Sequence, residues 1–344
     1  MDPISQGVVG VSATQLVSTH KQRVLAALLG FFSGMAADLD VLIGSSTDPL
    51  LGLEYHRHFT HALIFIPIGA LICTVFFRCI FKRRLESLSF KKTYLFCFLG
   101  YATHALLDAC TTYGTQLFWP FSNARIAWNN VSVVDPLFTI PLLILLVFAL
   151  SGRSPNAAKR SKMFSIIAVL YLFAYLGLGV LQNHRALKQA ELLALSRGHT
   201  PINLGVKPSF ANLVVWKSVY EYQGRYYVDA IRVFGGSKVY PGVSTPTLNL
   251  KKHFPWLDTA SQQAKDIERF RWFSNQHLGL DPDKPNRIID IRYSLLPNQM
   301  TGMWGIELDP NASAEQHVVW NTTRPKGAAA RQNIKQLLLM IKGV

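Results

Sequence analysis

Histidines and aspartates recur within the most apolar part of this sequence, in a pattern typical of metal ligands. His104 and Asp108 are four residues apart, so on a helix they lie on one face about one turn from each other. Ionisable side chains at membrane depth cost roughly 2.5 to 3.5 kcal/mol each, and a bound cation would offset that cost. The predicted ligands are Asp38, Asp40, His56, His61, His104 and Asp108.

Mixed imidazole and carboxylate donors indicate which ions such a site would take. Neutral imidazoles with carboxylates suit zinc, manganese or ferrous iron, and carboxylate-rich sites also bind magnesium. We therefore expect a divalent metal ion as cofactor, with zinc or manganese preferred and magnesium or iron as alternatives.

Other roles for these residues remain open at the level of sequence. Asp135 precedes Pro136, as helix N-caps often do, and Asp38 could cap a helix as well. Paired histidines could instead carry protons. For the whole set, metal binding explains the cluster better than separate roles do, because the cost of burying several carboxylates accumulates.

The elements that carry these residues are apolar segments of membrane length. Apolar runs cover 62–80, 93–110, 133–150 and 163–182, and the composition becomes that of an ordinary globular domain near residue 183. Twenty helical residues span about 30 Å, the thickness of the hydrocarbon core. We predict a polytopic α-helical membrane domain of five or six helices over 1–182, followed by a small α+β extramembrane domain over 183–344.

Basic residues predict how the helices are oriented. Residues 1–182 contain 14 Lys and Arg, and 12 of these fall in three short segments, 21–23, 78–92 and 153–162. The positive-inside rule places these segments in the cytoplasm. The predicted helices are then 4–19 inward, 24–43 outward, 62–80 inward, 93–110 outward, 133–150 inward and 163–182 outward, with 4–19 short enough to be re-entrant instead. All the predicted ligands, and the C-terminal domain, would lie at the outer face of a bacterial cytoplasmic (inner) membrane.

The second half reads as an α+β domain. Residues 211–234 alternate around Gln223 and Gly224 as a hairpin would, and 287–308 and 316–320 add strand candidates. Residues 258–278 and 327–342 have helical periodicity.

The net charge of +15 raises the question of partners. In the first half the charge follows membrane topology, so we expect membrane lipid and no nucleic acid. The second half has 21 Lys and Arg against 12 Asp and Glu, which would suit anionic headgroups or an envelope polymer, or simply a solvated basic surface.

At these residues the sequence resembles the YdjM-like membrane-bound metal-dependent hydrolases. The matching segments are MDPISQG at 1–7, Asp38-Leu39-Asp40, His56-Arg57, Thr60-His61, His104-Ala105-Leu106-Leu107-Asp108, Thr111 to Gly114, Trp119 to Ser122 and Val134-Asp135-Pro136. They cover about residues 1–150, and residues beyond them would be a C-terminal extramembrane extension. The resemblance implies a helical membrane domain, a metal site and hydrolase activity.

Two positions depart from the family pattern. His58 stands where a small residue is usual, so we do not count it as a ligand, and Gln6 stands where some members have histidine. Gln6 is therefore grouped with Asp2, Thr60 and Thr111 as residues that could support the ligands.

The predicted function is hydrolysis by metal-activated water, of a phosphoester at the lipid headgroup layer. Asp135 is the candidate general base, and Arg57 the candidate cation that stabilises developing charge. The alternatives are a non-catalytic, metal-stabilised membrane scaffold or regulator of the envelope, and an ion or proton conductor. The inner halves of 62–80 and 133–150 carry almost no polar residues, which disfavours a conducting path.

Overall fold

The computed structural model describes residues 1–151 and 157–344, and these form two compact units. The first consists of Met1–Leu42 with Tyr55–Gly179, and the second of Ile43–Glu54 with Val180–Val344. The segment Ile43–Glu54 therefore belongs to the second unit although both its neighbours in sequence belong to the first.

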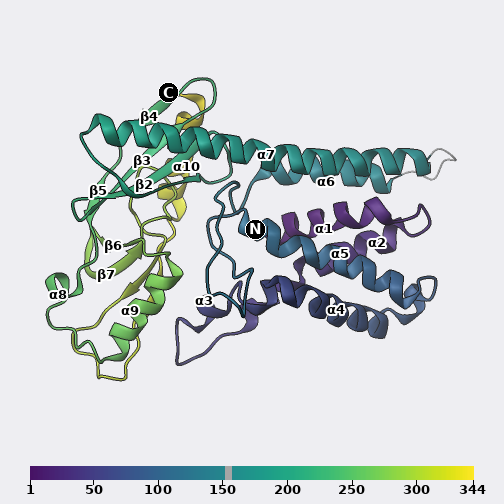
Figure 1. The fold of residues 1–344 in the computed structure, drawn as a ribbon, viewed down its shortest axis with the longest axis horizontal. Helices are drawn as coiled ribbons and strands as arrows, with labels where there is room; N and C mark the ends of the chain where they lie inside the picture. Colours follow the sequence, from purple (N-terminus) through teal and green to yellow (C-terminus); the bar gives the residue numbers. More distant parts are fainter. Residues whose placement is uncertain (152–156) are drawn as a thin grey trace. The chain divides into compact units, whose positions relative to one another are not determined.

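The first unit is helical, as the apolar runs predict (Figure 1). Its elements are α1 (Pro3–Val17), α2 (Arg23–Met35), the 3-10 helices η1 (Ala36–Leu42), η2 (Phe59–His61) and η3 (Leu63–Phe65), α4 (Ile66–Ile80), η4 (Lys82–Leu85), α5 (Phe90–Ala109), α6 (Pro136–Leu150) and the start of α7 (Ala157–Ser196). The helical N-terminal region predicted from the sequence is confirmed.

Three helical segments of the described chain are long and apolar enough to cross a membrane. They are Arg23–Leu42, Leu63–Ile80 and Ala157–Ser196, while the apolar α6 is shorter. Fewer than half of the residues in their apolar windows are buried inside the protein. Exposed side chains on α4 include Ile68, Ile72 and Phe76, which would face lipid rather than water.

Glycines let α1, α2 and α5 pack with their backbones in close approach. A Cβ added at Gly34 would lie 2.8 Å from the carbonyl oxygen of Gln6, and one at Gly100 would lie 2.6 Å from that of Gly30. Small residues at such positions are how membrane helices gain contact. Gly34 and Gly100 each lie within one turn of a candidate ligand, so this packing sets the distance between the ligand-bearing helices.

Replacing Gly100 by alanine should therefore destabilise the helical unit. The added methyl group has no space at the Gly30 carbonyl, and overpacking of this kind costs about 1–3 kcal/mol. The measurement is the Tm of the detergent-purified protein. Gly177→Ala in α7 is the matched control, because its added Cβ has no atom within 4 Å and alanine favours a helix. An unchanged Tm in Gly100→Ala would contradict the close packing.

The second unit contains two antiparallel sheets. The first comprises β1 (Ile202–Pro208), β2 (Val215–Tyr222), β3 (Arg225–Arg232), β4 (Lys238–Tyr240) and β5 (Ser244–Pro246), and the second β6 (Leu278–Asp281), β7 (Lys284–Asp290), β8 (Trp304–Glu307) and β9 (Val319–Thr322). The helices are α3 (Leu51–Tyr55), whose last residue belongs to the first unit, α8 (Leu250–His253), α9 (Gln262–Phe273) and α10 (Gly327–Lys342). Side chains from both sheets form one core, which includes Val219, Val228, Ile289 and Ile291.

The predicted hairpin is confirmed, since β2 pairs with β3 around Gln223 and Gly224. Both turn residues have positive φ, 48° and 69°, as a two-residue hairpin turn requires.

Helix α7 is longer than the apolar run predicts. The run ends at residue 182, but the helix continues to Ser196. Beyond the apolar run, Ala186, Ala190 and Ala194 are buried at every fourth position, so this extension packs along one narrow face.

Candidate metal centre

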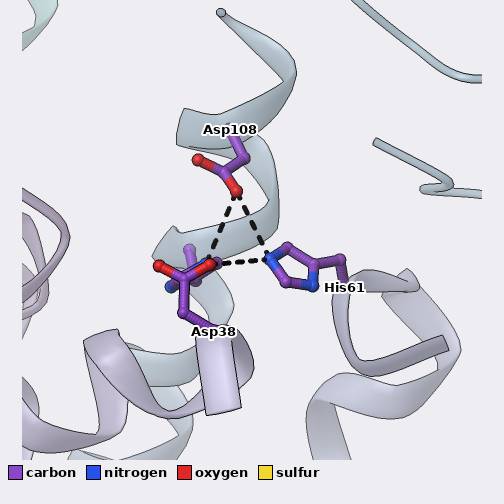
Figure 2. A group of neighbouring side chains, drawn as sticks. Asp38, His61 and Asp108 are labelled. Atoms are coloured by element: carbon purple, nitrogen blue, oxygen red, sulfur yellow. Dashed lines mark ion pairs between the residues drawn. The ribbon is translucent and has the colours of Figure 1, made fainter. Parts of the chain in front are cut away.

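Four of the six predicted ligands converge on one point inside the first unit. Asp38 comes from η1, His61 from η2, and His104 and Asp108 from successive turns of α5. One donor atom from each lies within 4.8 Å of the others. Figure 2 shows Asp38, His61 and Asp108 pointing toward one another across the gap between their elements.

The distances around this cluster are nearly equal. The Nε2 atom of His61 lies 3.5 Å from Asp38 Oδ1 and 3.3 Å from Asp108 Oδ2. The Nε2 atom of His104 lies 3.3 Å from Asp38 Oδ1 and 3.5 Å from Asp108 Oδ2. Each imidazole therefore faces both carboxylates, and neither forms a well-directed hydrogen bond with them.

The Nδ1 atoms of the two histidines lie against oxygen atoms of the protein. His104 Nδ1 lies 2.6 Å from the carbonyl oxygen of Gly34, and His61 Nδ1 lies 3.2 Å from Asp40 Oδ2. With the proton on Nδ1, each Nε2 presents a lone pair to the cluster, as in histidines that bind metals.

Two of the converging atoms, His61 Nε2 and His104 Nε2, are buried without a hydrogen-bond partner in the described chain, and both face Asp108 Oδ2, which is ion-paired with Arg57 Nε at 2.9 Å. Unsatisfied buried polar atoms are costly, so two imidazole nitrogens at one point call for an additional group. A divalent cation would satisfy both. These residues therefore fit a metal ion.

The cluster also favours positive charge electrostatically. Burial lowers the pKa of His61, but the facing carboxylates of Asp108, Asp38 and Asp40 raise it, with a net value of about 10. Because a metal ligand must be deprotonated, a metal ion would compete with a proton for His61.

Asp40 and His56 lie beside this cluster and are joined to each other. His56 Nδ1 lies 2.8 Å from Asp40 Oδ1, while Asp40 Oδ2 accepts from the Arg57 backbone N–H at 2.8 Å and from Thr60 Oγ1 at 2.9 Å. Asp38, Asp40 and His56 form a second group with donor atoms within 4.8 Å. Asp40 is thus in contact with both the ligand His61 and the loop that carries it.

Arg57 is buried next to Asp108. Its Nε atom lies 2.9 Å from Asp108 Oδ2, and its Nη1 donates to Thr111 Oγ1 at 2.8 Å. In the described chain its Nη2 has no hydrogen-bond partner. The guanidinium also lies over the Tyr113 ring, 4.7 Å from its centre. A cation with a spare donor therefore stands beside the cluster.

Three of the four predicted supporting residues contact the cluster. Gln6 Nε2 donates to Asp108 Oδ1 at 2.7 Å, Thr111 Oγ1 donates to the Asp108 carbonyl at 2.7 Å, and Thr60 Oγ1 lies 3.0 Å from His61 Nδ1. Asp2 instead caps α1 through the Ser5 backbone N–H.

Asp135 caps α6 and is not among the grouped residues. Its Oδ1 accepts from the backbone N–H groups of Leu137 and Phe138, and its Oδ2 accepts from the Tyr175 hydroxyl at 2.8 Å. Its role as a general base stays a prediction.

Sequence reasoning missed the groups that orient the ligands. These are the Gly34 carbonyl at His104 and the Tyr101 hydroxyl, which donates to the Thr60 carbonyl at 2.8 Å. The spacing of Gly30 and Gly34, four residues apart and opposite Gly100, was the available signal for close helix packing.

Fold and site together define a membrane protein with a buried histidine and aspartate cluster able to hold a metal ion. The family model described as YdjM inner membrane protein matches residues 1–186, more than half of the chain. The chain therefore belongs to this family, which confirms the resemblance found in its motifs.

Two relatives are similar to parts of the chain. The uncharacterized protein YfhP of Bacillus subtilis (strain 168) is 26% identical over 158 residues, 46% of each chain. The inner membrane protein YbcI of Escherichia coli (strain K12) is 32% identical over 111 residues, 30% of this chain and 60% of the relative. The chain thus matches about half the length of these curated relatives. No solved structure matches.

Proposed function

We propose that this protein is a membrane-bound metal-dependent hydrolase that acts on a phosphoester at the lipid headgroup layer. The observation that carries the proposal is the convergence of His61, His104, Asp38 and Asp108, with the Nε2 atoms of both imidazoles buried and unsatisfied. A divalent ion bound there supplies a Lewis acid and a water molecule of lowered pKa.

The donor types support zinc. Two imidazole nitrogens with two carboxylates are among the ligands that zinc prefers in proteins. The imidazole to carboxylate separations of 3.3–3.5 Å leave these four donors close enough together to share one ion. Asp40 would orient His61 through its Nδ1 atom, and His56 would in turn position Asp40 through the contact between its Nδ1 and Asp40 Oδ1.

Arg57 supports a phosphoester as the substrate. Its Nε and Nη1 atoms are used by Asp108 and Thr111, which leaves Nη2 to donate to a phosphate oxygen. Asp135 can act as general base only if it exchanges its Tyr175 hydrogen bond for one to water.

One observation favours the alternative of a non-catalytic scaffold. Four protein donors would fill a four-coordinate zinc site, and closed sites of this kind stabilise folds, whereas catalytic zinc usually keeps a position for water. Asp38, with 19% of its side chain exposed, is the ligand nearest solvent and the one whose displacement would open a position.

A measurement of enzymatic turnover distinguishes a hydrolase from a non-catalytic scaffold. In nanodiscs, the zinc-loaded protein should release phosphate or headgroup from a membrane phosphoester, and Arg57→Gln should lower kcat by about 100-fold, the effect of removing one donor to developing charge. Zinc content is measured in the same samples, and Arg83→Gln, an exposed change of equal charge, is the control. If the protein contains its full zinc but turns over none of a panel of phosphoesters, the result would contradict hydrolysis and favour the non-catalytic scaffold.

We also propose that the cluster and the C-terminal domain face outward across the bacterial inner membrane. In a background without the four native cysteines, an impermeant thiol reagent added to intact spheroplasts should label Asn123→Cys and should not label Ser87→Cys. Ser87 lies in a basic segment, and the positive-inside rule is the reason for the difference. Equal or reversed labelling would contradict this orientation.

A further inference from the structure

A basic pocket lies in the second unit, and none of its lining residues belongs to the metal cluster. It has a volume of about 330 Å³ and is lined by Arg185 and Lys188 of α7 and by Gly235, Gly236 and Ser237, which follow β3. All of these residues belong to the second unit.

The two cations of this pocket are not neutralised by the protein. Among the described residues, no carboxylate lies within 4.0 Å of Arg185 or Lys188, and the polar contact of Arg185 is a hydrogen bond of 3.2 Å to Gln182. The pocket therefore presents two exposed positive charges to which an anion can bind.

The glycine turn adds backbone donors. Gly235 and Gly236 have φ values of 67° and 105°, and turns of this kind can offer backbone N–H groups to an anion. In the described chain these two N–H groups have no hydrogen-bond partner. Arg232 Nη1 donates instead to the carbonyl oxygens of both glycines, at 3.5 Å each. Two N–H groups without partners, in a pocket also lined by two cations, suit a phosphate group.

The position on α7 indicates where such a phosphate comes from. The apolar run of α7 ends at residue 182. Along the helix, Arg185 lies about 4.5 Å beyond the end of this run, and Lys188 lies about 9 Å beyond it. The polar headgroup layer extends about 5–8 Å beyond the hydrocarbon core on each side. Val180 and Leu181, just before the pocket, are 41% and 46% exposed, so an acyl chain can pack beside them.

We propose that this pocket binds the phosphate group of an anionic phospholipid such as phosphatidylglycerol. Two cations without carboxylate partners select a headgroup with net negative charge over a zwitterionic one. The site is independent of metal binding and of hydrolysis, and gives the C-terminal unit a fixed attachment to the bilayer surface.

The direct test is acetylation of Lys188 in the full-length protein, quantified by mass spectrometry. In nanodiscs containing phosphatidylglycerol, Lys188 should react about 30-fold more slowly than in phosphatidylcholine nanodiscs, as expected for about 1 kcal/mol from each of two cations. The exposed Lys251 and Lys252 should react equally in both. Equal reactivity of Lys188 in the two lipids overturns the proposal.

Two further arms identify the ligand and the residues. Inorganic phosphate added to phosphatidylcholine nanodiscs should protect Lys188 far less than the lipid does, and equal protection would assign the pocket to free phosphate instead. In native mass spectrometry, the double variant Arg185→Gln and Lys188→Gln should no longer retain phosphatidylglycerol. The control double variant, Lys251→Gln and Lys252→Gln, should retain it fully. Equal loss in both double variants would mean only a general charge effect.

Discussion

His104→Ala should remove most of the bound metal from a protein that otherwise purifies with close to one zinc ion per chain. His104 contributes one of the unsatisfied buried nitrogens, and its ring is fixed by the Gly34 carbonyl. Loss of a ligand should weaken binding by more than the 10- to 100-fold typical of losing a group that only orients one. The measurement is zinc per chain by elemental analysis after dialysis against a weak chelator.

Matched variants make this result specific. Asp40→Asn should weaken zinc binding by about 10- to 100-fold, because Asp40 orients His61. His184→Ala, an exposed histidine of α7, should leave zinc unchanged. Size-exclusion profiles establish that the variants fold, and His104→Gln, which keeps a polar side chain, provides a milder substitution. Full zinc content in His104→Ala, His104→Gln and His61→Ala together would contradict the ligand set.

The helical N-terminal region was predictable from the sequence because long apolar runs favour helices. The cluster was predictable in part for the same reason: His104 and Asp108 share a helix face whatever the tertiary structure is. Asp38 faces both imidazoles, whereas Asp40 contacts only that of His61 among these two. These different positions depend on η1, where the chain forms a 3-10 helix. The spacing of Asp38 and Asp40 in the sequence does not indicate which of the two carboxylates faces both imidazoles.

Tertiary packing decides the remaining features. The Gly34 carbonyl reaches His104 only because α2 and α5 approach closely at glycines, and a backbone acceptor leaves no mark in side-chain patterns. The strands β4 and β5 are three residues each, too short for an alternating pattern to be distinguished from a loop.

The segment Ile43–Glu54 is the clearest case of a feature that sequence reasoning could not find. It connects Asp40 to His56, yet it belongs to the second unit, where Arg269 of α9 binds it. Arg269 donates to both oxygens of Asp48, at 3.0 and 2.7 Å, and its Nε donates to Glu54 at 2.5 Å. Nothing in the local sequence of either partner indicates a contact more than 200 residues apart.

Arg269→Ala should therefore weaken zinc binding by about tenfold although Arg269 is no ligand. Hydrogen bonds to charged groups are worth about 1.5–3 kcal/mol each, so their loss releases the segment between Asp40 and His56. Zinc binding must then order that segment, and about 1.4 kcal/mol of that cost corresponds to tenfold in affinity. Arg271→Ala is the control, since within the described residues the ion pair of Arg271 is with the exposed Glu268 on the same helix. Competition with a chromogenic chelator gives the affinity, and limited proteolysis should show faster cleavage within Ile43–Glu54 in Arg269→Ala alone. Wild-type zinc affinity combined with faster cleavage would show that the segment is held by Arg269 without positioning the metal ligands.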